Sequence, residues 1–495
     1  MTTTTPQPPA TTSGSTSAID RWFHLSARGS TYGREVRGGV VTFFTLAYIV
    51  VLNPLIIGTM KDVSGKLIGG NTEVGMAIAM VAAVTALVAG VMTILMGVVG
   101  RFPIAIAAGL GLNGFLAFTL APTMTWADAM GLVVIEGVII LILVLVGLRT
   151  AIFKAVPSAM KYAVAAGIGL FLVIIALVDA GIARPGVPLI TFGIGGALWG
   201  WPILTFCIGL LVMSVLFVRK VPGAILIGIA VATIFGMIVQ SVLNIGARSA
   251  DNPAGWGLNI PKLPTSLGDV FGVPNLGLLG QFNLFGSFST IGIIAASTAV
   301  FTLILTDFFD TMGTAYGLAE QAELTDEKGD IPHLQSILVV DSVAAIAGGA
   351  GSASSNTSYI ESGSGIAEGA RTGIASIVTG VLLLLAMFIA PLVTTVPWEA
   401  AAPALILVGF LMATQMKRID FTDYTIGIPA FLTIVIMPFT YSIANGIGAG
   451  FISYAILMAV TGKAKKVGWL MWIIAALFLV YFMQSPISGW LGLGS

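Results

Sequence analysis

The chain has 495 residues, of which 57% are hydrophobic and 9% are charged, and its formal net charge is zero. This neutral balance gives no indication of an acidic or basic partner, nucleic acid included. Apolar runs of about 16–25 residues recur along almost the whole chain and exclude an ordinary soluble protein, because only lipid can cover so much apolar surface. The sequence therefore predicts a protein of the lipid bilayer.

The first 38 residues are expected to lie outside the membrane. Residues 1–20 are rich in Thr, Ser and Pro and are expected to be disordered. They are not expected to be a signal peptide, because no apolar core follows a short basic start. Residues 17–38 contain Trp22, Phe23 and four arginines, which predicts a short interfacial helix; a disordered linker is the alternative.

Hydropathy predicts an all-α polytopic membrane protein with fourteen spanning segments. In chain order they lie near residues 39–60, 74–98, 102–120, 129–147, 158–180, 198–218, 222–243, 289–318, 333–350, 352–371, 372–394, 400–415, 424–440 and 442–461. A further apolar stretch, residues 468–483, is expected as a C-terminal helix that either lies on the membrane or forms an additional short span.

The basic residues predict the orientation of these segments. With the N-terminus in the cytoplasm, 17 of the 22 Lys and Arg residues fall on the cytoplasmic side. The five on the outer side are Lys61, Lys66, Arg184, Arg248 and Lys262. This asymmetry follows the positive-inside rule and favours both the orientation and the number of segments.

The longest loop, residues 244–288, is predicted to be extracytoplasmic and divides the segments into two groups of seven. Because seven is odd, the second group enters the membrane from the other side, which permits an inverted repeat of the kind common in secondary transporters. Segments 3 and 10 occupy equivalent places and are the most interrupted by Gly and Ser. Each is expected to contain a short strand that reaches mid-membrane and then a half-helix.

Acidic residues inside apolar segments mark the candidate site. Asp307 and Asp310 of segment 8 share one helix face because they are three residues apart, and Glu361 of segment 10 is a third carboxylate. Ionised carboxylates are costly at membrane depth and indicate function; carboxyl groups that only clamp helices together are the structural alternative. Glu136 of segment 4 is a weaker candidate. Six further acidic residues are expected in a solvated cytoplasmic loop and at its edges: Glu320, Glu323, Asp326, Glu327, Asp330 and Asp341.

The sequence indicates neither an enzyme nor a cofactor. It has no nucleotide-binding loop, no zinc-ligand spacing and no Ser-His-Asp set. Its one cysteine, Cys207, and its two histidines, His24 and His333, give no basis for a metal site within the spans. Without an ATP-binding module, uphill transport must use an ion gradient. The buried carboxylates favour a proton as the coupling ion, with Na⁺ as the less favoured alternative.

Three motifs in order carry a family resemblance: GLGLNGFLAF (109–118), DFFDTMGTAYG (307–317) and SSNTSYIESGSGIAEGARTG (354–373). With these motifs the chain resembles the AzgA-like purine permeases of the nucleobase–cation symporter family, from about residue 20 to residue 483. The resemblance implies fourteen segments in two inverted repeats of seven, within the cell membrane, and a homodimer. It implies a core domain from residues 39–147 and 289–394, and a gate domain from residues 158–243 and 400–461.

The resemblance also implies import of adenine, guanine or hypoxanthine with protons, by alternating access at a site between core and gate. Asp307 is similar to the purine-binding carboxylate of segment 8, Glu361 to the substrate glutamate of segment 10, and Asn113 to the polar contact of segment 3. Asp310 matches a second aspartate of segment 8, and Asp307, Asp310 and Glu361 are the expected proton-carrying groups.

Three aromatic residues are candidates for stacking on a planar base, with ordinary packing as the alternative: Phe115, Phe308 and Tyr359.

Other functions stay open at this point. Asn356 is followed by Thr357 and Ser358, so the glycine of the xanthine/urate signature is missing, which disfavours those substrates. A transporter of the same fold for uracil, xanthine or an anion is one alternative. An ion channel or sensor, whose carboxylates line a pore, is an alternative from a different class. The choice among adenine, guanine and hypoxanthine also stays open.

Overall fold

The protein is mostly helical, and its structure is a computed structural model that describes residues 17–148, 156–186, 190–325, 331 and 333–490. Within these residues ten helices are long and apolar enough to cross a membrane. Four shorter apolar helices accompany them, at Leu110–Leu120, Leu334–Ala350, Tyr424–Thr440 and Trp469–Met483. The expected all-α polytopic class is confirmed, whereas the number of fourteen crossings stays a prediction. Residues 1–16 and the expected loop residues Asp326, Glu327 and Asp330 lie outside the described residues.

A short helix, α1 (Ala18–Phe23), precedes the first long helix and covers only part of the expected 17–38, because the long helix already begins at Tyr32. The Arg101 guanidinium lies 4.1 Å from the centre of the Trp22 ring. Arg28 donates hydrogen bonds to the carbonyl oxygens of Arg101 and Arg371. These contacts fix α1 to one end of the helix bundle, which we call the arginine end. The place of α1 at a membrane surface stays a prediction.

The first apolar segment is a broken helix made of α2 (Tyr32–Leu46) and α3 (Ile49–Ile57). At the break, the amides of Val50 and Val51 bond carbonyl oxygens three residues back rather than four. Pro54, inside α3, removes one more helical hydrogen bond. The break leaves Tyr48 at a helix junction near the middle of the segment.

Glycines bring the next helices into close contact. α4 (Val74–Leu95) and the π-helical turn η2 (Met96–Gly100) pack against α15 (Gly373–Ala386). A side chain at Gly97 would collide with the Gly373 carbonyl, and one at Gly90 would collide with Leu384 and the Gly380 carbonyl. Small residues at such contacts let membrane helices approach backbone to backbone.

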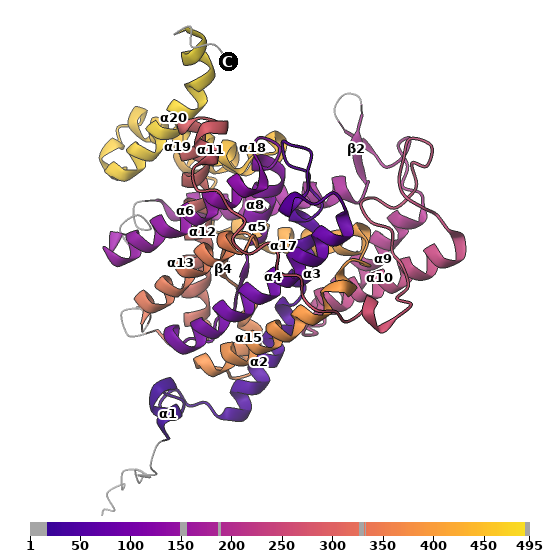
Figure 1. The fold of residues 1–495 in the computed structure, drawn as a ribbon. Helices are drawn as coiled ribbons and strands as arrows, with labels where there is room; N and C mark the ends of the chain where they lie inside the picture. The colour runs from indigo at the N-terminus through magenta and orange to yellow at the C-terminus, as the bar shows by residue number, and fades with distance from the viewer. Residues whose placement is uncertain (1–16, 149–155, 187–189, 326–330, 332, 491–495) are drawn as a thin grey trace, which may run out of the picture.

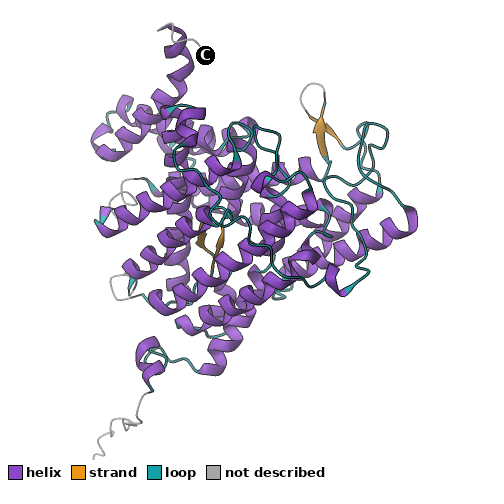
Figure 2. Cartoon of the chain, viewed as in Figure 1, coloured by secondary structure: helices purple, strands orange, loops and turns teal. Residues whose placement is uncertain are grey.

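Segments 3 and 10 are broken, as expected, and they meet at the centre of the bundle (Figure 2). Segment 3 consists of β1 (Ile106–Ala108), α5 (Leu110–Phe115) and η3 (Leu116–Leu120). Segment 10 consists of β4 (Asn356–Ser358) and α14 (Ser362–Ala367). The two strands pair antiparallel, with Ile106 opposite Ser358 and Ala108 opposite Asn356.

Three long helices enclose this strand pair. They are α4, which lies against β1, and α12 (Ile293–Gln321) and α13 (Leu334–Ala350), which lie against β4; α6 (Trp126–Leu145) packs behind α13. α6 and α13 pack closely, because Gly137 lies against Ile346 and Gly349 lies against the backbone of Val134. α11 (Gly286–Thr290) leads into α12, while η5 (Met387–Ile389) and α16 (Ala390–Val393) follow α15.

A second group of helices packs largely against its own members. Its pairs include α8 with α17, α8 with α18, α18 with α19, and α9 with α10 and α17. In Figure 1, α9 and α10 lie at the edge of the bundle opposite α6 and α13. The bounds are α8 (Ser158–Asp179), α9 (Trp201–Val218), α10 (Ala224–Leu243), α17 (Trp398–Ala413), α18 (Tyr424–Thr440) and α19 (Ile443–Val460).

The remaining elements lie at the edges of the bundle. The C-terminal helix α20 (Trp469–Trp490) continues beyond the expected 468–483 and packs on α19 and α12. A hairpin of β2 (Ala183–Pro185) and β3 (Ile190–Phe192) follows α8 (Figure 2). The short 3-10 turns are η1 (Ile68–Gly70), η4 (Leu267–Asp269), η6 (Thr414–Arg418) and η7 (Ala464–Lys466).

Candidate functional site

Side chains complete the hydrogen bonding of the central strands. The Thr93 hydroxyl bonds both the amide and the carbonyl of Ile106 at 2.9 Å. The Ala105 amide donates to the Ser362 hydroxyl, also at 2.9 Å. Non-helical backbone is tolerated at membrane depth only where protein satisfies it in this way. The strand pair therefore forms a rigid platform for the residues that follow β1 and β4.

Four side chains from three parts of the chain lie together beside this platform. We call them the acid–tyrosine cluster: Tyr48, Asp310, Tyr359 and Glu361. The Tyr48 hydroxyl donates to Glu361 Oε1 at 2.5 Å, and the Tyr359 hydroxyl donates to the Ala108 carbonyl at 2.6 Å. Asp310 is on α12, which packs against α14, the helix that begins directly after Glu361. The structure thus brings together three of the expected site residues.

Tyr48 is the member of this cluster that was not expected. An aromatic residue in an apolar segment is ordinary, so its sequence signal is weak. The available signal is its position six residues before Pro54, since a proline disturbs the helix that precedes it. The helix break at Tyr48 is what lets its hydroxyl reach Glu361.

One strip of α12 leaves the cluster accessible. Asp310, Gly313, Gly317 and Glu320 follow helical spacing and are all exposed. Ile360, next to Glu361, is 54% exposed although it lies at the centre of the fold. An uncovered path therefore runs from Asp310 toward the end of α12 that carries Glu320. Glu320 and Glu323 are exposed, as expected for the edge of a solvated loop.

Asn113 and Asp307 are both fully buried. Among the described residues neither amide atom of Asn113 has a hydrogen-bond partner. A buried polar group without a partner costs about 1–3 kcal/mol, so the Asn113 amide is a candidate ligand contact. Asp307 lies one turn before Asp310 on α12, which contacts α5, the helix of Asn113.

The three aromatic candidates have different surroundings. Tyr359 belongs to the acid–tyrosine cluster. Phe308 is fully buried and lies edge-on to Phe309, with ring centres 5.6 Å apart. Phe115 is nearly buried and forms part of the wall of a cavity. The structure thus places these rings at separate positions, and a stacking role stays a prediction for each.

The expectation for Asp341 is wrong. Asp341 is fully buried on α13 instead of solvated in a loop. It accepts hydrogen bonds from the Thr311 hydroxyl at 2.8 Å and from the Ser358 hydroxyl at 3.0 Å. Thr311 also contacts the Thr357 hydroxyl at 2.8 Å. The error was to group Asp341 with the loop acids, because the expected segment 333–350 already contains it: α13 starts at Leu334, and Asp341 is in its third turn.

Glu136 lies on α6 behind the same strand and is fully buried. It accepts a hydrogen bond from Ser355 at 3.3 Å through Oε1, while Oε2 has no partner among the described residues. Asp341 and Glu136 thus form a second layer of carboxyl groups that contacts β4 and the residue before it. The described residues contain no group of three or more His, Cys, Asp or Glu side chains placed to hold a metal ion.

These features define a class of protein. A multi-pass helical protein in which two central segments break around buried carboxyl and amide groups is a solute transporter of the broken-helix type. The chain belongs to the Permease family, whose family model matches residues 33–449.

Relatives and a solved structure agree with this assignment. Guanine/hypoxanthine permease PbuG of Bacillus subtilis (strain 168) is 38% identical over 471 residues, which cover 93% of this chain and 99% of the relative. Adenine permease AdeP of Escherichia coli (strain K12) is 34% identical over 466 residues, which cover 93% and 95%. The resemblance to purine permeases is confirmed. The expectation that the protein is a transporter rather than an enzyme is confirmed as well.

The fold is also similar to that of the transmembrane domain of a cyanobacterium bicarbonate transporter, BicA. The TM-score is 0.58 at 16% sequence identity, and the match covers 84% of this chain and 96% of that chain. At this identity the similarity concerns the fold alone.

Proposed function

We propose that the protein imports a purine nucleobase, hypoxanthine, guanine or adenine, by proton symport with alternating access. The observation that carries this proposal is the acid–tyrosine cluster together with the Asn113 amide, which has no hydrogen-bond partner among the described residues. The relatives named for guanine, hypoxanthine and adenine transport support the same substrate class.

The chemistry of the site suits a purine. A purine carries ring N–H groups and ring nitrogen acceptors in one plane. The carboxylates of Asp307 and Glu361 accept its N–H hydrogens, and the Asn113 amide offers both a donor and an acceptor. Tyr359, a ring of the cluster, is the candidate for stacking on the base.

The proposed coupling group is the pair of Asp310 and Glu361. Two like charges placed close together repel each other, and a partly buried site screens this repulsion less than bulk water does. Uptake of one proton removes this repulsion, and a bound purine N–H provides the remaining carboxylate with a partner. Proton and substrate therefore stabilise the same loaded state, which is the requirement for symport.

Alternating access then requires two bodies that move against each other. We assign the core to residues 39–147 and 289–394 and the gate to residues 158–243 and 400–461, since each group packs largely within itself. The arginine end, with Arg28, Arg101 and Arg371 in contact, is assigned to the cytoplasm of a cell membrane. A homodimer is part of the proposal by family membership.

Uptake of radiolabelled hypoxanthine in a purine-uptake-deficient host tests the function directly. Competition by unlabelled adenine, guanine, xanthine and uracil ranks the substrates, and a protonophore tests the coupling. Saturable uptake that purines compete for and a protonophore abolishes is the expected result. Uptake no greater than in the empty host would reject a purine importer. Competition by uracil alone would favour the same-fold alternative, and current without nucleobase would favour a channel.

A further inference from the structure

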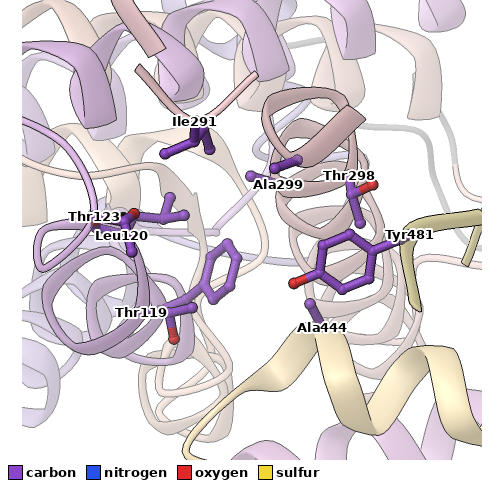
Figure 3. Close-up of a pocket in the computed structure, with 10 residues that line it drawn as sticks. Thr119, Leu120, Thr123, Ile291, Thr298, Ala299, Ala444 and Tyr481 are labelled. Carbon is purple, nitrogen blue, oxygen red and sulfur yellow. Dashed lines mark hydrogen bonds between the residues drawn. The ribbon is translucent and has the colours of Figure 1, made fainter. Parts of the chain in front are cut away.

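A cavity of about 190 Å³ lies where four elements meet (Figure 3). Phe115 and Thr119 of segment 3 form one wall, Thr298 of α12 a second and Ala444 of α19 a third. Tyr481 of α20 forms the fourth wall, and its hydroxyl points into the space. Phe115 follows Asn113 by two residues of α5, so their side chains point to roughly opposite faces of this helix, and α5 separates the cavity from the Asn113 amide.

The cavity lies toward the end of the bundle opposite the arginine end. Segment 3 starts after Arg101, at the arginine end, and Thr119 and Thr123 are near its other end. Ile291, also in the wall, precedes the first turn of α12. In the proposed orientation the cavity therefore faces the cell exterior, between core elements (η3, α12) and a gate element (α19).

α20 is held firmly in place above this cavity. Phe478 is 1% exposed, and its ring lies edge-on to those of Phe301 of α12 and Phe451 of α19, with ring centres 5.8 and 6.5 Å apart. Gly448 of α19 leaves the room that the Phe478 ring occupies. α20 thus joins a core helix to a gate helix, and its packing fixes the position of Tyr481.

The lining of the cavity is apolar with a few hydroxyl groups. Thr123 and Thr298 donate their hydroxyl hydrogens to carbonyl oxygens of their own helices, so their oxygen atoms keep acceptor capacity. The Tyr481 hydroxyl has no hydrogen-bond partner among the described residues. The alanines, Leu120 and Ile291 supply apolar walls. A lipid tail would form no hydrogen bond with these oxygens. A base donates from its ring N–H groups to the threonine oxygens, and its ring nitrogens accept from the Tyr481 hydroxyl.

The size agrees with such an occupant. A volume of about 190 Å³ equals about six water molecules at roughly 30 Å³ each, which is enough for one small bicyclic base. Threonine oxygens accept from its N–H groups, the Tyr481 hydroxyl donates to a ring nitrogen, and its faces lie against apolar side chains.

We propose that this cavity is an outer vestibule that binds a purine nucleobase before it reaches the acid–tyrosine cluster, with Tyr481 of α20 as a contact that determines specificity. The proposal rests on the proposed function and orientation. It makes the C-terminal helix a part of the substrate path.

The single cysteine of the chain offers a direct test. Cys207 is exposed on α9, so a Cys207→Ser full-length chain serves as background for Thr298→Cys. Intact cells are treated with a membrane-impermeant thiol reagent, with and without hypoxanthine. Hypoxanthine at about ten times its dissociation constant is expected to slow labelling about tenfold. Ser289→Cys, exposed on α11 outside the cavity, is the matched control and is expected to react at the same rate with and without hypoxanthine.

A second background separates the vestibule from the central site. Glu361→Gln disables the acid–tyrosine cluster, so protection of Thr298→Cys that persists in this background comes from the vestibule. If hypoxanthine no longer protects Thr298→Cys in the Glu361→Gln background, the protection came from movement of the core against the gate, and the inference is overturned. Absence of labelling from outside, or labelling that hypoxanthine does not slow, also overturns it.

These outcomes do not depend on transport. Uptake without protection leaves the proposed function intact and removes the vestibule. Protection without uptake keeps a purine-binding vestibule and removes the importer.

Tyr481→Phe tests the specific contact. Loss of one neutral hydrogen bond is expected to raise the hypoxanthine concentration needed for half-protection about threefold to tenfold. Leu479→Ala, on the exposed face of the same helix, is expected to leave that concentration unchanged. Equal behaviour of the two variants would remove Tyr481 from the site.

Discussion

Tyr48 and Glu361 are 313 residues apart in the chain and share a hydrogen bond of 2.5 Å. The donor stands at the break between α2 and α3, and the acceptor stands at the start of α14. Each partner therefore depends on an interruption of regular structure in its own segment. The bond holds one oxygen of the proposed substrate carboxylate in place, and a carboxylate keeps further lone pairs with which to accept from a ligand.

Tyr48→Phe is expected to weaken hypoxanthine uptake without changing protein abundance. A hydrogen bond to a charged group contributes about 1.5–3 kcal/mol, so the apparent affinity is expected to fall about tenfold or more. Concentration-dependent uptake measures this change. Tyr454→Phe, at a buried tyrosine of α19, is the control. Wild-type affinity in Tyr48→Phe would remove this bond from substrate binding.

Asp310→Asn is expected to abolish the response of uptake to a pH gradient. In the wild type, an acidic exterior supplies protons to the Asp310–Glu361 pair, so accumulation rises as the outside pH falls. The amide is permanently neutral and carries no proton, so only equilibration of substrate is expected. Accumulation ratios in vesicles with and without an imposed gradient decide the point. Glu320→Gln, at the exposed end of the same helix strip, is expected to keep the wild-type response.

Asp341→Asn is expected to reduce uptake more than Ser358→Ala does. Asp341 accepts from Thr311 and Ser358, and the amide nitrogen of Asn cannot accept. Ser358→Ala removes only one donor and costs about 0.5–1.5 kcal/mol. Uptake rates normalised to the amount of protein in the membrane compare the two. The reverse order would mean that Asp341 does not position β4.

Glu35→Gln is expected to destabilise the fold. The buried Glu35 carboxylate accepts from the backbone amides of Arg371, Thr372 and Ala375 at the start of α15. A negative charge at a helix N-terminus with such bonds stabilises by about 1–3 kcal/mol. A lower midpoint of thermal unfolding in detergent is the expected readout. The same change at Glu73, exposed at the N-terminus of α4 and without a hydrogen bond to its amides, removes only about 0.3–1 kcal/mol and should lower the midpoint less.

Gly97→Leu and Gly75→Leu form a matched pair on one segment. A side chain at Gly97 meets the Gly373 carbonyl and Ile377, whereas one at Gly75 meets nothing within 4 Å. Overpacking costs about 1–3 kcal/mol, so only Gly97→Leu is expected to lower the yield of folded protein. Gel-filtration profiles of the two purified variants show the difference. Similar profiles would contradict close packing of α4 on α15.

The sequence predicted those features of the structure that depend on the local composition of a segment. Apolar runs predicted the helices, and the Gly- and Ser-rich interruptions predicted the strands of segments 3 and 10, which the structure confirms. Asp310 and Glu361 were identifiable because a carboxylate in an apolar run is conspicuous.

The remainder depends on tertiary contacts that no local pattern contains. Tyr48 becomes a site residue only through a break and a partner from the other half of the chain. Asp341 was misplaced although its segment, 333–350, was correctly bounded, because its partners Thr311 and Ser358 come from other segments and leave no local signal. The position of α20 above the cavity depends on the packing of Phe478. The hydropathy of residues 468–483 is compatible both with a helix that lies on the membrane and with a short span.

The pairing of β1 with β4 has a consequence for biosynthesis. The amide of Ala105 finds its partner in Ser362, 257 residues later, and β4 does not exist when segment 3 leaves the ribosome. Unsatisfied backbone groups cost several kcal/mol each in lipid. Segment 3 therefore cannot settle in the bilayer when it is made, and it must stay sheltered by the insertion machinery or by neighbouring helices until segment 10 arrives. The arrival of segment 10 therefore completes both the backbone hydrogen bonding of segment 3 and the transport site.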